Sequence, residues 1–516
     1  MAPLVPKVET LDQVYAGAGE GSAVPRELQQ RFVNLVRSFE QQFGHKPDFV
    51  SRSPGRVNII GEHVDYSLYN VLPTAVAVDV LIATRAHKTD NDPPVIKITN
   101  INPSKYPAKE ITIPESGSIE VDRESHSWSN YFIAGLSGSL KYLRNKLGDS
   151  FKTNGMELLI DGNVPAGGGL SSSAAFVCAS ALAVMAANGY EISKQDLLDL
   201  CIVSERAVGV FSGGMDQAAS IFSERGFLLY CRFFPEFAAQ HVPVPASDPE
   251  VTFLIAQSFV TSDKAVTAPI HYNLRVVEVT LATVVLAKLH DIPLNPDDSS
   301  LGFSLRNFQE ELVKRDGKRD DDALSQVDYV IAAIKSNLTK DEYTRQDISQ
   351  ILEISVEEVE KYYFSKFPVR AETFKLRQRA LHVLEEAGRV LRFKDALSSS
   401  TGKLDEKKLL YLGDLMNQTQ ASCKDVYECS APEIDEICSI ARQAGAYGSR
   451  LTGAGWGGCT VHLVPQHKVA EVAEALKRQY YYPKFPDITD EKLKEALVIS
   501  KPGQGSSLIV GAALDV

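Results

Sequence analysis

Residues 164–175 read Val-Pro-Ala-Gly-Gly-Gly-Leu-Ser-Ser-Ser-Ala-Ala, and this stretch decides the expected fold. The apolar run 156–160 before it predicts a strand, and the small apolar residues 174–187 after it predict a buried helix that ends at Asn188-Gly189. A loop at a helix N-terminus presents free backbone N–H groups and the positive end of the helix dipole to an anion. The order strand, glycine loop, helix therefore predicts a phosphate site, with a flexible loop and helix cap as the alternative.

The residues of this loop suit a phosphate chain. Glycine has no Cβ, so a phosphate can approach the backbone closely at Gly167, Gly168 and Gly169. The hydroxyls of Ser171, Ser172 and Ser173 add donors or a metal ligand.

Composition and charge limit the classes of protein to which the chain can belong. The chain has 516 residues, enough for two or three domains, and its 44% hydrophobic and 23% charged content is ordinary for a soluble globular protein. The net charge of −12 argues against nucleic acid as the main partner. Seven scattered cysteines without Cys-x-x-Cys spacing, no signal peptide and no membrane-length apolar run predict a cytosolic protein with free thiols.

The pattern divides the chain into an arm and two domains. Residues 1–25, rich in Gly, Ala and Pro, are expected to form a loose arm. Residues 26–245 mix an amphipathic helix at 27–43 with short β-type runs and apolar helices. Residues 246–516 open on an apolar strand at 253–256 and close on a strand, a helix and a strand, which predicts a small layered domain. The charged residues 297–366 are expected to form a solvated helical insertion.

A second polar stretch is Gly-Arg-Val-Asn-Ile-Ile-Gly-Glu-His-Val-Asp-Tyr at 55–66. It places Arg56, Glu62, His63 and Asp65 around one strand and turn. Burying such groups is costly unless they are paired or hold a ligand, and carboxylate and imidazole groups suit the vicinal hydroxyls of a sugar. An exposed charged turn is the alternative.

Two further glycine stretches complete the pattern. Asp216 follows Gly213-Gly214 and precedes small residues, so it could orient or deprotonate an attacking hydroxyl, or it could be a turn aspartate. Residues 448–458 contain a Gly-x-Gly-x-x-Gly match, but a strand follows it, whereas a dinucleotide site needs a helix there. We interpret it as a glycine turn that closes over the nucleotide or the active site.

Together these four stretches resemble the GHMP kinase superfamily, which is named for galactokinase, homoserine kinase, mevalonate kinase and phosphomevalonate kinase. Residues 55–66 match the signature of its galactokinase family. The length, the insertion and residues 449–459 are similar to fungal galactokinases and to animal N-acetylgalactosamine kinases. The resemblance implies an α+β fold with a mixed α/β N-terminal domain, a layered ferredoxin-like C-terminal α/β domain and an active site between them.

The resemblance also implies an activity: ATP-dependent, Mg²⁺-assisted phosphorylation of galactose at its anomeric hydroxyl. Asp216 would be the base or orienting group, and Arg56 would stabilise charge between the sugar hydroxyl and the γ-phosphate. The implied sugar contacts are Arg56, Glu62, His63, Asp65, Gly213, Gly214, Asp216 and Tyr272. The implied phosphate contacts are Gly167, Gly168, Gly169, Ser171 and Ser172.

The resemblance also implies contacts with the metal ion and with the rest of the nucleotide. Ser173 and Glu205 would neighbour the Mg²⁺ ion, and Asp263 and Lys264 would touch the nucleotide. Trp128 and Tyr131 would flank the adenine, unless they are ordinary core aromatics. Two other functions stay open: an N-acetylgalactosamine kinase, and a galactose sensor that binds ATP and engages a transcriptional repressor. The complete Ser171-Ser172-Ser173-Ala174 segment favours catalysis over the sensor. We expect a monomer without membrane contact.

Overall fold

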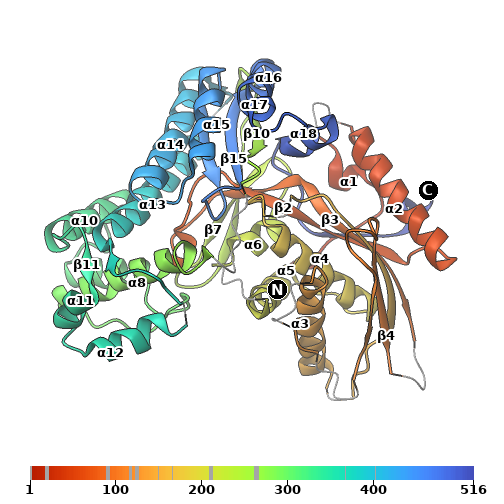
Figure 1. Cartoon of the computed structure of the whole chain (residues 1–516), viewed down its shortest axis with the longest axis horizontal. Coiled ribbons are helices and arrows are strands. Elements are labelled where there is room, and N and C mark those ends of the chain that lie inside the picture. Colours follow the sequence, from red (N-terminus) through yellow and green to blue (C-terminus); the bar gives the residue numbers. More distant parts are fainter. Residues whose placement is uncertain are drawn as a thin grey trace.

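The computed structural model describes residues 3–17, 23–88, 93–114, 119–122, 127–148, 150–165, 167–208, 213–260, 267–366, 368–400 and 402–516. Figure 1 shows two α/β lobes and a largely helical lobe that meet near the end of strand β2. In the described ranges, no helix is both long and apolar enough to cross a membrane.

The N-terminal lobe is built on a seven-stranded sheet with the order β1-β17-β2-β3-β6-β4-β5. These strands are β1 (Lys7–Val8), β2 (Phe49–Asn58), β3 (Pro73–His87), β4 (Val95–Asn100), β5 (Lys109–Thr112), β6 (Gly155–Gly162) and β17 (Ser507–Ile509). One face is covered by α1 (Asp12–Tyr15) and α2 (Arg26–Phe43). The other carries α3 (Asn130–Leu147), α4 (Ser172–Ala187), α5 (Lys194–Ala207) and α6 (Met215–Phe222). Helix α4 is buried almost all round, which its small apolar residues allow.

The expectation of a loose arm at 1–25 is wrong for residues 3–17. Strand β1 pairs in parallel with β17, and Val8, Val14 and Tyr15 are buried. The Tyr15 hydroxyl donates to Asp79, which also pairs with Arg52. The segment is held in place because β1 pairs with β17, which lies near the other end of the chain. Strand β17 belongs to the N-terminal sheet, so the expected C-terminal domain does not extend to residue 516.

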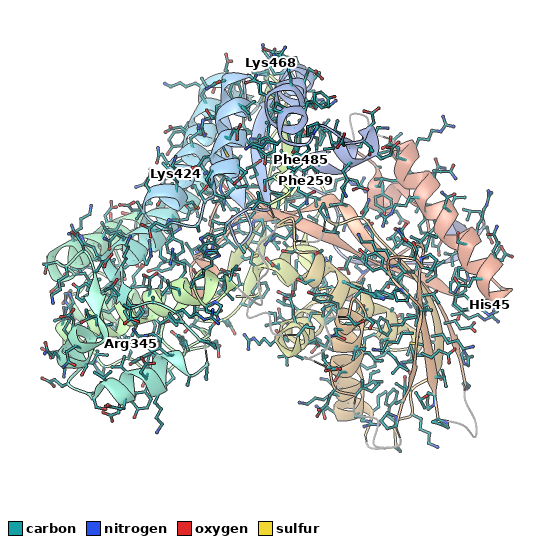
Figure 2. All side chains as sticks on the ribbon, in the orientation of Figure 1. His45, Phe259, Arg345, Lys424, Lys468 and Phe485 are labelled. Carbon is teal, nitrogen blue, oxygen red and sulfur yellow. The ribbon has the colours of Figure 1, made fainter. Side chains whose placement is uncertain are left out.

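The C-terminal lobe contains a four-stranded sheet with the order β14-β15-β10-β16. The strands are β10 (Val251–Gln257), β14 (Gly448–Thr452), β15 (Cys459–Pro465) and β16 (Leu497–Ser500), and all neighbours are antiparallel. Numbered along the chain, the order is 2-3-1-4, which is the ferredoxin-like arrangement. Helices α15 (Pro432–Gln443), α16 (Val469–Leu476), α17 (Tyr482–Lys484) and α18 (Asp490–Ala496) complete this lobe. Figure 2 labels Phe259 and Phe485, whose rings meet edge to face at 5.2 Å in its core.

The helical lobe contains the charged insertion. Its helices are α8 (Tyr272–Leu289), α9 (Leu305–Arg315), α10 (Ala323–Asn337), α11 (Arg345–Leu352), α12 (Val356–Val359), α13 (Leu376–Ser398) and α14 (Glu406–Asp425). The expectation that residues 297–366 are merely solvated is wrong, because Phe308, Val330 and Ile348 are fully buried in the core shared with α8 and α13. The charges lie on the outer faces, and Ser304 and Asp322 cap α9 and α10.

Three further two-stranded sheets pair β7 (Phe227–Arg232) with β8 (Ala238–Pro243), β9 (Ser247–Asp248) with β13 (Leu404–Asp405), and β11 (Tyr343–Thr344) with β12 (Thr373–Phe374). The α+β class is confirmed, with a mixed α/β lobe and a ferredoxin-like lobe. The predicted strand at 156–160 and helix at 174–187 correspond to β6 and α4.

Candidate active site

Arg56 joins the phosphate loop (residues 164–173) to Asp216. Strand β2 is irregular between Pro54 and Arg56, and such a bulge redirects a side chain. The Arg56 Nη1 atom donates to the Gly169 carbonyl at 2.6 Å. Its Nε and Nη2 atoms both bind Asp216 Oδ1, at 2.8 and 2.6 Å. Three segments that are far apart in the sequence therefore share one buried guanidinium.

The phosphate loop has the backbone that its glycines predict. Gly167 and Gly169 have φ angles of +69° and +73°, and α4 begins at Ser172, so the last two residues of the loop form the start of the helix. Ser171, the N-cap of α4, is also left-handed at φ 57°, a strained conformation for a residue with a side chain. Its Oγ has no hydrogen-bond partner in the described ranges. Ser172 and Ser173 are half-buried at the first turn of the helix. The loop thus directs amides and hydroxyls to one place.

The glycine turn (residues 453–458) packs directly on the phosphate loop. A Cβ on Gly169 would lie 2.6 Å from the Thr452 carbonyl, and a Cβ on Gly453 would lie 2.6 Å from the Gly169 carbonyl. The two loops therefore touch backbone to backbone, which glycine alone permits. Strand β15 follows the turn, so it lacks the helix that a dinucleotide fingerprint requires.

Glu62 and His63 lie at the junction of the lobes. The Glu62 carboxylate pairs with Arg450 and accepts from the Gly453 N–H at 3.3 Å. Burial raises the pKa of Glu62, and Arg450 opposes that rise. The His63 Nε2 lies 2.9 Å from the Ala454 carbonyl oxygen. The rings of Tyr427, Tyr272 and Trp456 surround His63 with centroids at 5.1, 5.7 and 5.8 Å.

Asp65 lies against Gly213 and is close enough to Asp216 for the two charges to interact. A Cβ on Gly213 would be 2.4 Å from the Asp65 carboxylate, so this glycine allows the acid to approach the backbone. Burial raises the pKa of Asp65 to about 6, and the like charge of Asp216 adds to the effect. Gly214 precedes α6 with φ 98°, which places Asp216 in the first turn of that helix. Two acids and the half-buried Tyr272 thus face one region.

Three aromatic rings lie beside the start of α4. Trp128 stacks on Phe176 at 6.1 Å with an interplanar angle of 10°, and Tyr131 lies 6.2 Å from the same ring. All three side chains are half-buried. Phe176 lies one helical turn after Ser172 and was not predicted, because an aromatic residue in an apolar helix looks like core.

The expected metal neighbours lie on separate helices. Ser173 is in the first turn of α4, and buried Glu205 on α5 accepts from Gln217, the residue after Asp216. In the described ranges, no three His, Cys, Asp or Glu side chains form a group that could hold a metal by themselves. Asp263 and Lys264 lie outside the described residues.

Several supporting residues had no local signal. Glu386 on α13 accepts from the Gly61 and Glu62 N–H groups at 2.8 and 3.1 Å. Burial alone would raise the pKa of this carboxyl, but the charges of Arg389 and Arg450 outweigh burial and lower the pKa to about 2. The nearby His382 Nε2 lies 3.1 Å from the Glu62 carbonyl oxygen. Both residues lie more than 300 positions from the turn that they hold, so only the fold reveals them.

Three family models match segments of this chain. The model "Galactokinase galactose-binding signature" matches residues 37–86, "GHMP kinases N terminal domain" matches 130–224, and "GHMP kinases C terminal" matches 401–482. The fold and the site thus define a GHMP kinase.

Relatives that match nearly the full length of the chain show which family of GHMP kinases it belongs to. The chain is 41% identical over 508 residues to the galactokinase of Saccharomyces cerevisiae, covering 94% of this chain and 96% of that protein. It is 39% identical over 505 residues to the galactokinase of Schizosaccharomyces pombe, with the same coverage. The structure of Lactococcus lactis galactokinase complexed with galactose shares the fold, with a TM-score of 0.65 and 24% identity over 92% of this chain and 98% of that chain. The chain belongs to the galactokinase family of the GHMP kinases and is a sugar kinase.

Proposed function

We propose that this protein transfers the γ-phosphoryl group of ATP to the anomeric hydroxyl of D-galactose. The observation that carries the proposal is Arg56, which binds the phosphate loop at Gly169 and the acid Asp216 with one guanidinium. Phosphoryl transfer needs its acceptor, its donor phosphate and a fixed positive charge at one point. Arg56 supplies that charge at the meeting point of the other two groups.

Asp216 would receive or orient the hydroxyl proton. Both guanidinium hydrogen bonds go to its Oδ1, and among the residues that the structure describes no hydrogen bond or ion pair uses Oδ2. A sugar hydroxyl can therefore donate to Oδ2 while Arg56 fixes the carboxylate. Because Arg56 stays protonated, it also offsets negative charge that develops on the transferring phosphoryl group.

The nucleotide would lie along the start of α4. Backbone amides at Gly167–Gly169 and the hydroxyls of Ser171 and Ser172 suit the phosphates, while Trp128 and Tyr131, with Phe176, offer a face for the adenine. Ser173 and Glu205 offer the oxygen ligands that Mg²⁺ prefers and would hold it together with phosphate oxygens. That ion supplies further charge neutralisation. Asp263 and Lys264 remain proposed nucleotide contacts.

The sugar would lie between Asp65 and His63. The proposed hydrogen-bonding groups are Glu62, His63, Asp65, Tyr272 and the Gly213-Gly214 backbone, a mixture of acceptors and donors that suits vicinal hydroxyls. All seven cysteines are free and buried, which supports the proposed cytoplasmic location.

Product formation with a panel of sugars tests the proposal. The purified protein is incubated with MgATP and galactose, N-acetylgalactosamine or glucose, ADP release is coupled to NADH oxidation, and the product is identified by ³¹P NMR. We expect galactose 1-phosphate as the main product. Faster turnover of N-acetylgalactosamine would reassign the substrate, and sugar-dependent thermal stabilisation without any turnover would favour the sensor.

A further inference from the structure

Asn58 is a buried side chain without an assigned role. The residue is fully buried at the end of β2, and neither its Oδ1 nor its Nδ2 has a hydrogen-bond partner among the residues that the structure describes. Leaving both halves of a side-chain amide unpaired in the interior is unfavourable, so such a residue calls for an explanation by a ligand or by water.

The backbone of Asn58 is fixed from the C-terminal lobe. Its N–H donates to Thr452 Oγ1 at 3.0 Å, and its carbonyl accepts from Arg450 Nη1 at 2.6 Å. Arg450 also pairs with Glu62, so Asn58 and Glu62 share one guanidinium. The backbone that carries the unpaired amide is therefore fixed by the C-terminal lobe, and Arg450 links it to Glu62, one of the proposed sugar residues.

The direction of the side chain follows from strand geometry. Asn58 comes two residues after Arg56 in a regular part of β2, where Arg56, Val57 and Asn58 pair in register with Ala75, Thr74 and Pro73. Side chains two residues apart leave the same face of a strand. The amide of Asn58 thus leaves the face from which Arg56 reaches Asp216 and the phosphate loop.

An amide suits a hydroxyl better than it suits a phosphate. It offers one acceptor and two donors, whereas a sugar hydroxyl both donates and accepts, so one hydroxyl can pair with either half of the amide. Glu62, His63 and Asp65 are as inaccessible as Asn58 in this conformation, at 2, 4 and 7% exposure. A sugar that reaches Glu62 must approach Arg450, which also holds the Asn58 carbonyl.

We propose that Asn58 is a specificity-determining residue that hydrogen-bonds one non-reacting hydroxyl of the sugar. This inference rests on the proposed function, and it adds a contact that discriminates between sugars that differ at that hydroxyl. A site with a buried polar group rejects an analogue that lacks the matching hydroxyl, because the group then stays unpaired.

The test is a double-mutant cycle between Asn58→Leu and deoxygalactoses. Leucine has nearly the same size without polar atoms. The kcat/KM of wild type and variant is measured for galactose and for its 2-, 3-, 4- and 6-deoxy derivatives at saturating MgATP. We expect Asn58→Leu to lower kcat/KM for galactose by roughly 10- to 100-fold, mainly through KM, with the KM for ATP unchanged. For the deoxysugar that lacks the contacted hydroxyl, the two proteins should be equally active.

Two further variants keep the test decisive. Asn58→Ala replaces Asn58→Leu if the leucine variant does not fold. Asn188→Leu is the control, because Asn188 lies at the far end of α4 and its amide is satisfied by Thr153, Asn154 and Val184. We expect Asn188→Leu to lower the Tm and to leave the KM for galactose unchanged.

Different results would overturn the role of Asn58 and the proposed kinase function. An equal loss for galactose and every deoxysugar, or an unchanged KM for galactose, would overturn the role of Asn58 while leaving the kinase assignment intact. Absence of galactose turnover by the wild-type protein would instead overturn the proposed function.

Discussion

Replacing Asp65 by Asn should stabilise the free protein and weaken sugar binding. Asp65 is buried, and its pKa is raised to about 6 from 3.8, first by burial and then by Asp216. A raised carboxyl pKa means that the folded state disfavours the charged form. A difference of about two pKa units corresponds to roughly 3 kcal/mol of destabilisation at pH 8, where Asp65 is ionised.

The sign of the pH dependence follows from proton binding. Between pH 4 and 6 the folded protein retains a proton on Asp65 that the unfolded chain has lost, so this group lowers the unfolding free energy as pH rises through that window. Asn does not titrate. The stability of Asp65→Asn relative to wild type should therefore be roughly 1–2 kcal/mol greater at pH 8 than at pH 5.

Urea denaturation of both proteins at pH 5 and pH 8 measures this difference, and activity assays at pH 8 measure the KM for galactose. We expect that KM to rise at least about 10-fold in Asp65→Asn, because Asn lacks the charged acceptor. A stability difference that does not change with pH, or a variant that is less stable than wild type at pH 8, would refute the reasoning.

Three other substitutions test neighbouring parts of the site. Gly169→Ala should raise the KM for ATP at least about 10-fold, because residue 169 has φ +73° and its new Cβ would meet the Thr452 carbonyl. Gly189→Ala is the matched control, because Gly189 has φ +68° and open space around it. This control should lose about 1 kcal/mol of stability with no change in the KM for ATP. Trp128→Ala should weaken ATP binding by about 1 kcal/mol without affecting galactose, as measured by calorimetry, and an equal loss for both ligands would count against an adenine contact. Glu386→Gln should destabilise the fold by about 3–5 kcal/mol in urea at pH 7, because the lowered pKa of this acid means that its stabilising charge is present there. A neutral effect would show that the buried Arg389 charge needs no partner.

Local patterns predicted the parts of the fold that are made of neighbouring residues. The glycine loop before α4 was predictable because both flanking elements have clear periodicity. The strand after the glycine turn likewise excluded a dinucleotide fingerprint. The approach of Asp216 to the loop was expected from the family resemblance, and no spacing in the chain could show that Arg56 links them.

Contacts between residues far apart in the sequence explain why the expectations for the N-terminal arm and the charged insertion were wrong. The glycine- and proline-rich arm is typical of an unstructured segment, yet β1 finds a partner in β17. The insertion is charged overall, but its apolar residues recur at helical spacing and reach the core. The support of the backbone of Gly61 and Glu62 by Glu386 could not be predicted, because a single acid in an amphipathic helix has no distinguishing signal.

The central claim is that Asp216, held by Arg56 beside the phosphate loop, acts on the sugar hydroxyl. The most direct measurement is galactose-dependent ADP release by Asp216→Ala, with thermal shifts by galactose and by MgATP recorded on the same protein. We predict a loss of kcat of at least about 1000-fold while both ligands still stabilise the folded protein. Turnover within a few-fold of wild type would contradict the claim and assign the chemistry to another residue.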